Sequence, residues 1–271
     1  MALSLIKGTD TFFTFGHSVT EFLFSGQWKP SDTAEGGGQV GAAMFLAGSL
    51  VTCLLSLIIS LPFSLASSIY MTEIATPQRR RLIQPAIELF TGIPSVVYGF
   101  VGMTVLIPAL RHIFPMPFGF SVLAAGIVLA IMIFPTITTM AADAMAAVPK
   151  SWREASYGLG ATRWETIAHV VLPAAKSGIF TGIILGLARA LGEALAVAMV
   201  IGQMKVFPTS LFLPASTLTT AISADMGGAM EGGEYNAALW TMALVLFLLS
   251  FLFIFVIHQI NAASEVKGGR N

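Results

Sequence analysis

An arginine and a glutamate stand four residues apart in an otherwise apolar stretch, at Arg189 and Glu193. On a helix this spacing projects both side chains from nearly one face, where their charges neutralise one another. Such a pair rarely repays its desolvation, and an ionisable residue in an apolar span is by default a functional hypothesis. The arginine fork is suited to a tetrahedral oxyanion. We expect Glu193 to hold Arg189 until an anion arrives; a purely structural or assembly pair is the alternative.

Residues for other chemistry are scarce in this chain. The single cysteine, Cys53, excludes an internal disulfide and a cysteine-based metal cluster. No His-Glu-x-x-His motif occurs, the four histidines are scattered, and Ser95 has no histidine in a span to act as its base. No Gly-x-x-x-x-Gly-Lys-Ser/Thr motif occurs either, so ATP binding through a P-loop is excluded. We therefore expect no catalytic residue, metal or cofactor on this chain.

The composition places these residues in a membrane. Of 271 residues, 55% are apolar and 10% are charged, whereas soluble domains carry roughly 25% charged residues. The net charge of zero argues against a nucleic-acid partner. A helical span needs about 20 mainly apolar residues. The predicted fold class is all-α, a polytopic membrane helix bundle of about five transmembrane helices. The expected spans are 42–71, 86–110, 120–142, 177–202 and 237–260, with candidate kinks at Pro62, Pro94 and Pro135.

Lysines and arginines set the expected orientation, because cytoplasmic loops carry an excess of them. Nine of the 14 lie after the first span, after the third span or in the tail, and four lie on the opposite side. We therefore expect the N-terminus outside and the C-terminus in the cytoplasm. Glu73 opens a basic loop, with Arg79 to Arg81, that is expected to face lipid headgroups. The predicted domains are an outward or interfacial segment over 1–40, a transmembrane domain over 41–262 and a cytoplasmic tail over 263–271.

The N-terminal segment mixes several phenylalanines with Asp10, His17 and Glu21, and is too polar to span a membrane. Such a segment can lie at the interface as an amphipathic element. The run Gly36-Gly37-Gly38 indicates a loop rather than a phosphate-binding nest, because no strand precedes it and no Lys-Ser/Thr follows it.

The cytoplasmic loop over 149–173 carries two helix-start signals. The pairs Ser151–Glu154 and Thr162–Glu165 each have the spacing of a capping box. Two glycines, at 158 and 160, lie between these starts, where a helix can end in a left-handed turn. The pattern predicts a short helix, a glycine turn and a second short helix that ends near Pro173. Trp164 is expected to be an exposed aromatic anchor, a residue type enriched at interface hot spots. A merely connecting loop is the alternative.

Small residues recur at every fourth position of the fourth predicted span. Such a ridge lets another helix approach closely and winds slowly around its own helix. The ridge predicts a tightly packed helix, with Arg189 and Glu193 beside it and facing an interface or a central pathway. Its members include Gly178, Gly182, Gly186 and Ala190.

The loop over 149–173 also fits a longer pattern. Glu154-Ala155-Ser156, three residues, Gly160, nine residues, Val170, one residue and Leu172-Pro173 resemble the EAA loop of ABC importer permeases. Ser156 and Val170 depart from the family pattern, and both keep its size class. In that family the loop forms a coupling helix that docks on a cytoplasmic ATPase subunit, and we call 149–173 the coupling loop. The resemblance implies that docking here involves Glu154, Ala155, Gly160 and Trp164.

Three further stretches resemble phosphate-specific (Pst) permeases, in particular their C-type subunit. Residues 91–99, Thr-Gly-Ile-Pro-Ser-Val-Val-Tyr-Gly, look like the second-core-span motif, and 208–218 resembles the outward loop. Residues 188–193, Ala-Arg-Ala-Leu-Gly-Glu, are similar to a segment whose arginine and glutamate lie on the substrate path in that family. The likeness covers roughly 22–260 and implies the type I importer core. Such permeases usually have an additional helix before the first span found here.

The resemblance implies a transport subunit, not an enzyme, that imports inorganic phosphate through a bacterial inner membrane. ATP would be bound by a partner. The implied partners are a second permease subunit, a cytoplasmic ATPase dimer, an external phosphate-binding protein and the lipid bilayer. A sulfate or molybdate permease is the alternative, because the Arg-Leu-Gly-Glu part is shared with those families. An intramembrane enzyme has no motif to support it. A channel or secondary transporter would need internal repeats and would leave the coupling loop unexplained.

Overall fold

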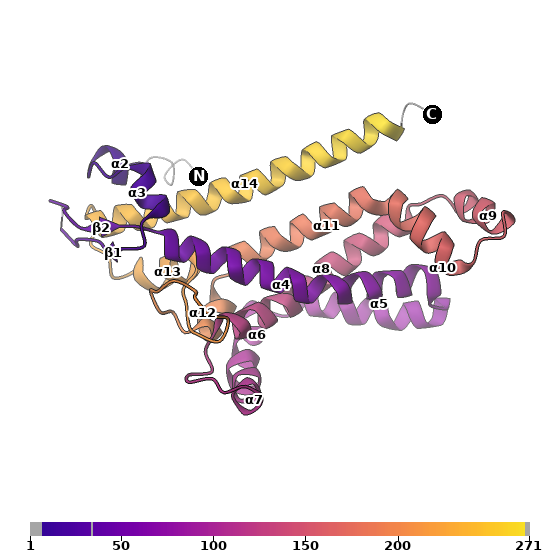
Figure 1. Cartoon of the computed structure of the whole chain (residues 1–271), viewed down its shortest axis with the longest axis horizontal. Coiled ribbons are helices and arrows are strands. Elements are labelled where there is room, and N and C mark those ends of the chain that lie inside the picture. Colours follow the sequence, from indigo (N-terminus) through magenta and orange to yellow (C-terminus); the bar gives the residue numbers. More distant parts are fainter. Residues whose placement is uncertain (1–6, 34, 269–271) are drawn as a thin grey trace. The chain divides into compact units, whose positions relative to one another are not determined.

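The computed structural model describes residues 7–33 and 35–268 and is mainly helical (Figure 1). In this part of the chain five helical stretches are long and apolar enough to cross a membrane, which confirms the all-α prediction of about five spans. The chain divides into two compact units. Unit 1 comprises 1–56, 94–129 and 190–251, and unit 2 comprises 57–93, 130–189 and 252–271. The five stretches are Ala43–Ile74, Ser95–Ile113, Val122–Ala146, Arg163–Gly192 and Glu234–Val256.

The first, third and fifth predicted spans are confirmed, with ends shifted by a few residues. The first is α4 (Ala43–Ile69) followed by a π-helical turn, η1 (Tyr70–Ile74). The third is α8 (Val122–Ala146), and the fifth is α14 (Glu234–Gly268). Helix α14 continues through 263–268 of the predicted tail, and residues 269–271 lie outside the described part.

The second predicted span is wrong at its start, because the helix is interrupted within it. Helix α5 (Pro77–Gly92) ends before Pro94, since a residue that precedes proline is pushed out of the helical region, and Ile93 has a ψ of 126°. The span itself begins after this break. It consists of α6 (Ser95–Val101), η2 (Gly102–Leu106) and α7 (Ile107–Ile113). Pro62 and Pro135, by contrast, lie inside α4 and α8.

The fourth span begins earlier and ends sooner than predicted. Helix α10 (Arg163–Thr166), the π-helical turn η3 (Ile167–Val171) and α11 (Leu172–Gly192) form one continuous stretch. The predicted helix end near Pro173 is wrong, because the wider π-helical turn directly before it relieves the clash of the proline ring with the preceding turn. The stretch stops at Gly192, and α12 (Leu195–Ile201) begins after a break of two residues.

Unit 2 has an apolar core formed mainly by α8, η3 and α11. Helix α9 (Lys150–Gly158) lies between α8 and α10 along the chain and contributes no buried residue. The packed pair α8 and α11 therefore positions the coupling loop at one of its ends, and α9 adds no buried residue to the core. The buried core residues are Ala141, Met145, Val148, Val171, Ala175 and Ile179.

Unit 1 folds the N-terminal segment onto the membrane helices. Helices α2 (Asp10–Phe13) and α3 (Val19–Phe24) precede two short antiparallel strands, β1 (Trp28–Lys29) and β2 (Gln39–Val40). The indole ring of Trp28 meets the Phe45 ring edge-on, with the centroids 5.1 Å apart. The surrounding core draws on α4, α14 and a short helix, α13 (Leu218–Asp225). Its large buried side chains are Phe22, Phe45, Leu218, Leu239 and Met242.

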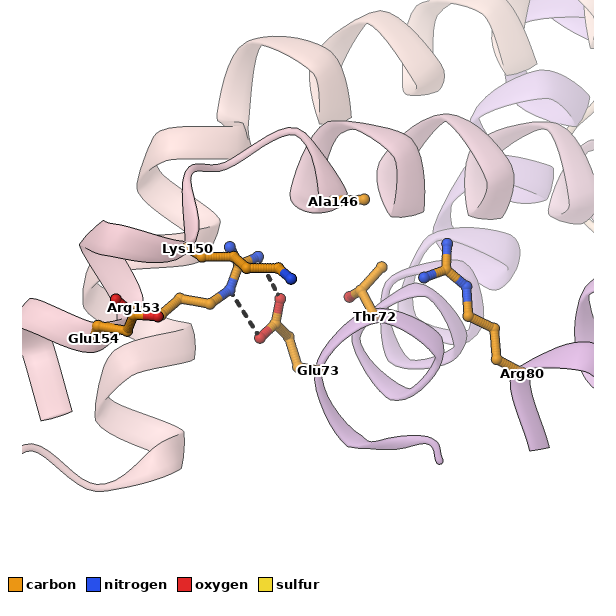
Figure 2. A pocket seen from close by; sticks show the side chains of 7 residues that line it. All are labelled: Thr72, Glu73, Arg80, Ala146, Lys150, Arg153 and Glu154. Atoms are coloured by element: carbon orange, nitrogen blue, oxygen red, sulfur yellow. Dashed lines mark hydrogen bonds and ion pairs between the residues drawn. The ribbon is translucent and has the colours of Figure 1, made fainter. Parts of the chain in front are cut away.

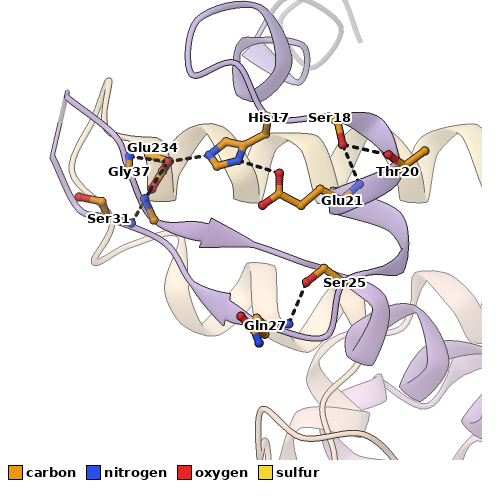
Figure 3. A network of polar contacts seen from close by, with 10 residues as sticks. His17, Ser18, Thr20, Glu21, Ser25, Gln27, Ser31, Gly37 and Glu234 are labelled. Carbon is orange, nitrogen blue, oxygen red and sulfur yellow. Dashed lines mark hydrogen bonds and ion pairs between the residues drawn. The ribbon is translucent and has the colours of Figure 1, made fainter.

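A buried carboxylate ties the N-terminal segment to the first turn of α14 (Figure 3). Glu234 is fully buried, and its oxygens accept hydrogen bonds from the amides of Ser31, Gly37 and Gly38 at 2.6 to 3.2 Å. His17 Nε2 lies 2.7 Å from Glu234 Oε1. Gly37 has a φ of +94°, a conformation that glycine adopts readily. The glycine run is a loop, as predicted, but its amides do form an anion nest, whose anion is the chain's own Glu234.

The pH dependence of unfolding tests this network. Burial lowers the pKa of His17, but hydrogen bonds and charges from Glu234 and Glu21 outweigh it and raise the pKa above 6.5. The stabilisation is therefore fully present below 6.5 and is lost as the pH rises through the raised pKa of the folded state. We expect the melting temperature in detergent to fall across that window, and His17→Gln to flatten the fall. Replacement of the exposed His112 by Gln serves as the control. Equal slopes for the wild type and His17→Gln would contradict the prediction.

Candidate functional site

The predicted helix, turn and helix are present in the coupling loop. Helix α9 ends at Gly158, and Gly160 has a φ of +87°, which confirms the left-handed turn. The Thr162–Glu165 capping box is confirmed, because the Thr162 hydroxyl accepts from the Glu165 amide and the Glu165 carboxylate accepts from the Thr162 amide. The Ser151–Glu154 box is wrong. Helix α9 already begins at Lys150, so Ser151 lies inside the helix and has no free end to cap.

The coupling loop exposes the residues that the family resemblance assigns to docking. Glu154, Ala155, Gly160 and Trp164 are all exposed. Three other large hydrophobic side chains are exposed beside them, and the sequence analysis missed all three: Trp152 is 54% exposed, Tyr157 is 45% exposed and Leu159 is 90% exposed. An exposed cluster of large apolar side chains is typical of an interaction surface. The coupling loop can therefore offer a partner both apolar anchors and the Glu154 carboxylate.

A buried ion pair fastens α9 to the end of the first span (Figure 2). The Arg153 guanidinium lies 2.7 Å and 3.3 Å from the two carboxylate oxygens of Glu73, which belongs to η1. The Glu73 side chain is only 7% exposed, so it does more than open the basic segment that follows. The pair lines a pocket of about 380 Å³ within unit 2. Sequence analysis missed it because 80 residues separate its two members.

Arg189 lies near the end of α11 and is half-buried in unit 2. Its Nη1 donates to the Thr136 hydroxyl of α8 at 3.2 Å. A guanidinium carries five N–H donors in a fixed fork, so this bond orients the group and uses one of them. The arrangement is suited to an anion that accepts several hydrogen bonds at once.

Glu193 does not continue the helix of Arg189, so the prediction of a shared helical face is wrong. Helix α11 ends at Gly192, and Glu193 lies in the break before α12. Its Oε1 accepts from the Ala196 amide at 3.1 Å, in the first turn of α12, where a negative charge is favoured. Its backbone carbonyl accepts from the Thr219 hydroxyl at 2.8 Å. The side chain therefore serves unit 1 locally, as a partner for an amide that the break leaves open.

A small cavity of about 10 Å³ adjoins Glu193 within unit 1. Its size suits about one water molecule. The sequence analysis noted Thr217 only as part of a loop motif and missed the rest, although buried serines and threonines recur along α4. Among the residues that the structure describes, no three His, Cys, Asp or Glu side chains gather to hold a metal ion. The hydroxyl-bearing residues of the cavity are Ser49, Thr52, Thr217 and Thr219.

The ridge of small residues brings α11 against α8 in unit 2. Gly178 meets Ala144, and a methyl group at Gly182 would lie 2.8 Å from Met140 Cβ. A methyl group at Gly186 would lie 2.8 Å from the Ile137 side chain. Ala190, the next residue of the ridge, is buried in unit 1. The glycines thus fix the distance between the helices that carry Arg189 and Thr136.

Solved structures share this arrangement of helices. A chain of a bacterial alginate ABC transporter matches with a TM-score of 0.66 at 15% identity, over 96% of this chain and 86% of that chain. A chain of the inward-facing MetNI methionine ABC transporter matches with a TM-score of 0.60 at 23% identity, over 83% and 94%. These identities establish the fold alone. The protein has the fold of a type I ABC importer permease, as the sequence predicts.

Sequence comparison identifies the family. Residues 69–264 match the family described as binding-protein-dependent transport system inner membrane component. The chain is 48% identical to the probable ABC transporter permease protein YqgH of Bacillus subtilis (strain 168), over 96% of this chain and 84% of the relative. It is 37% identical to the phosphate transport system permease protein PstC of Pasteurella multocida (strain Pm70), over 98% and 87%. The chain belongs to the family of binding-protein-dependent transport system inner membrane components.

Substitution at the ridge tests the packing of α8 and α11. Gly182→Ala places a methyl group against Met140 Cβ, and overpacking of this kind costs about 1–3 kcal/mol. We expect a clear drop in the melting temperature in detergent. Gly92→Ala is the matched control, because nothing lies within 4 Å of a methyl group there, and its effect should stay within about 0.5 kcal/mol. An equal effect of both substitutions would refute the close approach at Gly182.

Proposed function

We propose that this chain is the transmembrane permease subunit of an ATP-driven importer of inorganic phosphate. The observation that carries the proposal is the near-full-length similarity to a phosphate transport system permease, in a chain that keeps a half-buried arginine in its fourth span. The chain is a transport subunit and not an enzyme. Its role is to form half of the path and to couple it to a separate ATPase.

Arg189 is the proposed anion-binding group of the path. In an apolar span the attraction between a guanidinium and phosphate is much stronger than in water. The bond that Arg189 donates to Thr136 holds the fork in one orientation, which favours paired hydrogen bonds to two phosphate oxygens.

Glu193 is the second proposed group on the path. Its carboxylate already accepts one amide in α12, so it presents a fixed negative charge near the helix break. That charge repels an approaching phosphate unless the carboxylate moves aside. A break in the backbone lets the flanking helices reorient as the phosphate approaches. The proposed path therefore has an attracting group, Arg189 near the end of α11, and a repelling group, Glu193 in the break that follows along the chain.

Coupling to ATP hydrolysis is assigned to the coupling loop. The chain has no P-loop motif, so ATP would be bound by a cytoplasmic ATPase dimer. Glu154, Ala155, Gly160 and Trp164 would contact that partner, since all four are exposed. A second permease subunit would complete the path, and an external phosphate-binding protein would deliver the anion. The excess of lysine and arginine around the coupling loop supports a cytoplasmic position for it and an N-terminus outside.

Replacement of Arg189 by Ala tests the anion site. Removal of one partner from a desolvated charge pair costs about 2 kcal/mol or more, so labelled phosphate uptake should fall at least about 30-fold. The cells used should lack their own permease and carry the partner subunits. Arg111→Ala, at an exposed arginine of α7, is the control and should retain uptake. Normal uptake by Arg189→Ala would exclude the assigned role.

Competition for uptake by unlabelled sulfate or molybdate tests which anion is transported. Uptake blocked by one of these rather than by phosphate would leave the assignment as a permease intact but change its substrate.

Replacement of Trp164 by Ala tests docking of the ATPase. Truncation of a central aromatic anchor typically costs about 2 kcal/mol, which corresponds to roughly 30-fold weaker binding. We expect less ATPase to copurify with the variant while the permease itself stays folded. Phe118→Ala removes another exposed aromatic side chain, in the connection between α7 and α8, and should leave copurification unchanged. Undiminished ATPase binding by Trp164→Ala would speak against this docking surface.

A further inference from the structure

The Arg153 fork joins α9 to two membrane helices at once. Its Nη2 and Nε atoms bind the Glu73 carboxylate at the end of the first span, as described above. Its Nη1 donates to the Val148 carbonyl at 2.6 Å, and Nη2 also donates to the Met145 carbonyl at 2.8 Å. Met145 lies in the last turn of α8, and Val148 lies in the connection just after it. One side chain therefore links the coupling loop to the ends of α4–η1 and α8.

A second arginine closes the connection from the other side of the coupling loop. Arg163, the first residue of α10, donates to the backbone carbonyl of Glu73. The hydroxyls of Ser156 and Thr166 lie 2.9 Å apart and join α9 to the α10 side of the turn. Glu73 is thus held through its side chain by α9 and through its backbone by α10.

Polar contacts rather than apolar packing hold α9 in place. The helix has no buried residue, and the space beside the ion pair is the 380 Å³ pocket. Figure 2 shows Arg80 on the far side of this pocket from Glu73 and Arg153, and Lys150 beside the pair. The Arg153 and Glu73 side chains are themselves only 16% and 7% exposed. A buried pair of this kind is weak as a source of stability, but a bidentate geometry fixes direction well.

We propose that the Glu73–Arg153 pair is the joint through which a displacement of the coupling loop moves the ends of α4–η1 and α8. The inference rests on the proposed function, in which the coupling loop docks on an ATPase. Arg153 and Glu73 are positioning residues in this scheme, because they touch neither the anion nor ATP. The exposed apolar side chains of the coupling loop bind the partner, and the ion pair carries the movement into the membrane helices.

Glu73→Gln tests the joint in the complete complex of permease subunits, ATPase and phosphate-binding protein, reconstituted in proteoliposomes. The measurement is phosphate transported per ATP hydrolysed. Glutamine keeps the shape but loses the charge, so we expect this ratio to fall roughly three- to tenfold while the ATPase remains bound. Arg80→Gln is the matched control, because it removes a charge from the same pocket on the side away from the pair. Its ratio should stay at the wild-type value.

A second substitution separates a joint from a merely structural contact. Arg153→Lys keeps the charge but loses the fork, so its ratio should lie between those of the wild type and Glu73→Gln. The double variant should be no worse than Glu73→Gln alone, because members of one pair are not additive. An unchanged ratio in both single variants, or loss of the bound ATPase in either, would overturn the proposal. Absence of phosphate uptake by the wild-type complex would instead contradict the proposed function, and the same ratio would then be measured with the anion that it transports.

Discussion

A membrane span offers no water to a backbone carbonyl or a charge, and this constraint shapes the interruptions in the helices. After Gly192 the Thr219 hydroxyl binds the Glu193 carbonyl, and the Glu193 carboxylate binds an amide of α12. Hydroxyls inside the spans follow the same principle, as when Thr52 donates to the Gly48 carbonyl one turn back. Most polar groups of the spans are thus used locally. Arg189 differs, because one bond to Thr136 leaves most of its fork for another ligand.

Two kinds of contact connect the elements of unit 2: close packing between helices, and polar contacts of arginine side chains. Glycines at 178, 182 and 186 place α11 so close to α8 that a methyl group at any of the three would clash with α8. The coupling loop, in contrast, is fastened by Arg153 and Arg163 through charges and carbonyls. A movement that enters through this polar connection reaches a stiff helix pair, which carries Arg189 at its other end. In the proposed scheme the same helix pair lies between the coupling loop and the proposed anion site.

The sequence predicts the spans well and their interruptions poorly. Hydropathy decides where a chain enters a membrane, so the predicted first, third and fifth spans lie within a few residues of the observed ones. Proline is a weaker signal, because Pro94 follows a helix end whereas Pro62 and Pro135 lie inside helices. The difference depends on how neighbouring turns satisfy the freed carbonyls, which no local pattern reveals.

Contacts between residues far apart along the chain could not be predicted from local sequence patterns. The Thr162–Glu165 capping box is a local interaction and was predicted, whereas the partners of Glu73 and Glu234 lie far away along the chain. In the sequence, a buried ion pair is visible only as two residues of opposite charge near helix ends. Any sequence offers several such combinations, so the correct one cannot be chosen from the sequence. The assignment of Arg189 and Glu193 to one face failed for a different reason. It assumed an unbroken helix, and Gly192 ends it.

The contacts of Glu234 also bear on the order in which the chain is made. His17 precedes its partner Glu234 by 217 residues. The amides of Ser31, Gly37 and Gly38 donate hydrogen bonds to the same carboxylate, so they too have no partner until Glu234 is made. A ribosome must therefore complete four spans before the residue that organises the N-terminal segment exists. Contacts of such large sequence separation form late. The N-terminal segment is thus the first part of unit 1 to be synthesised and the last to form its contacts. It forms them only when the start of α14 is present.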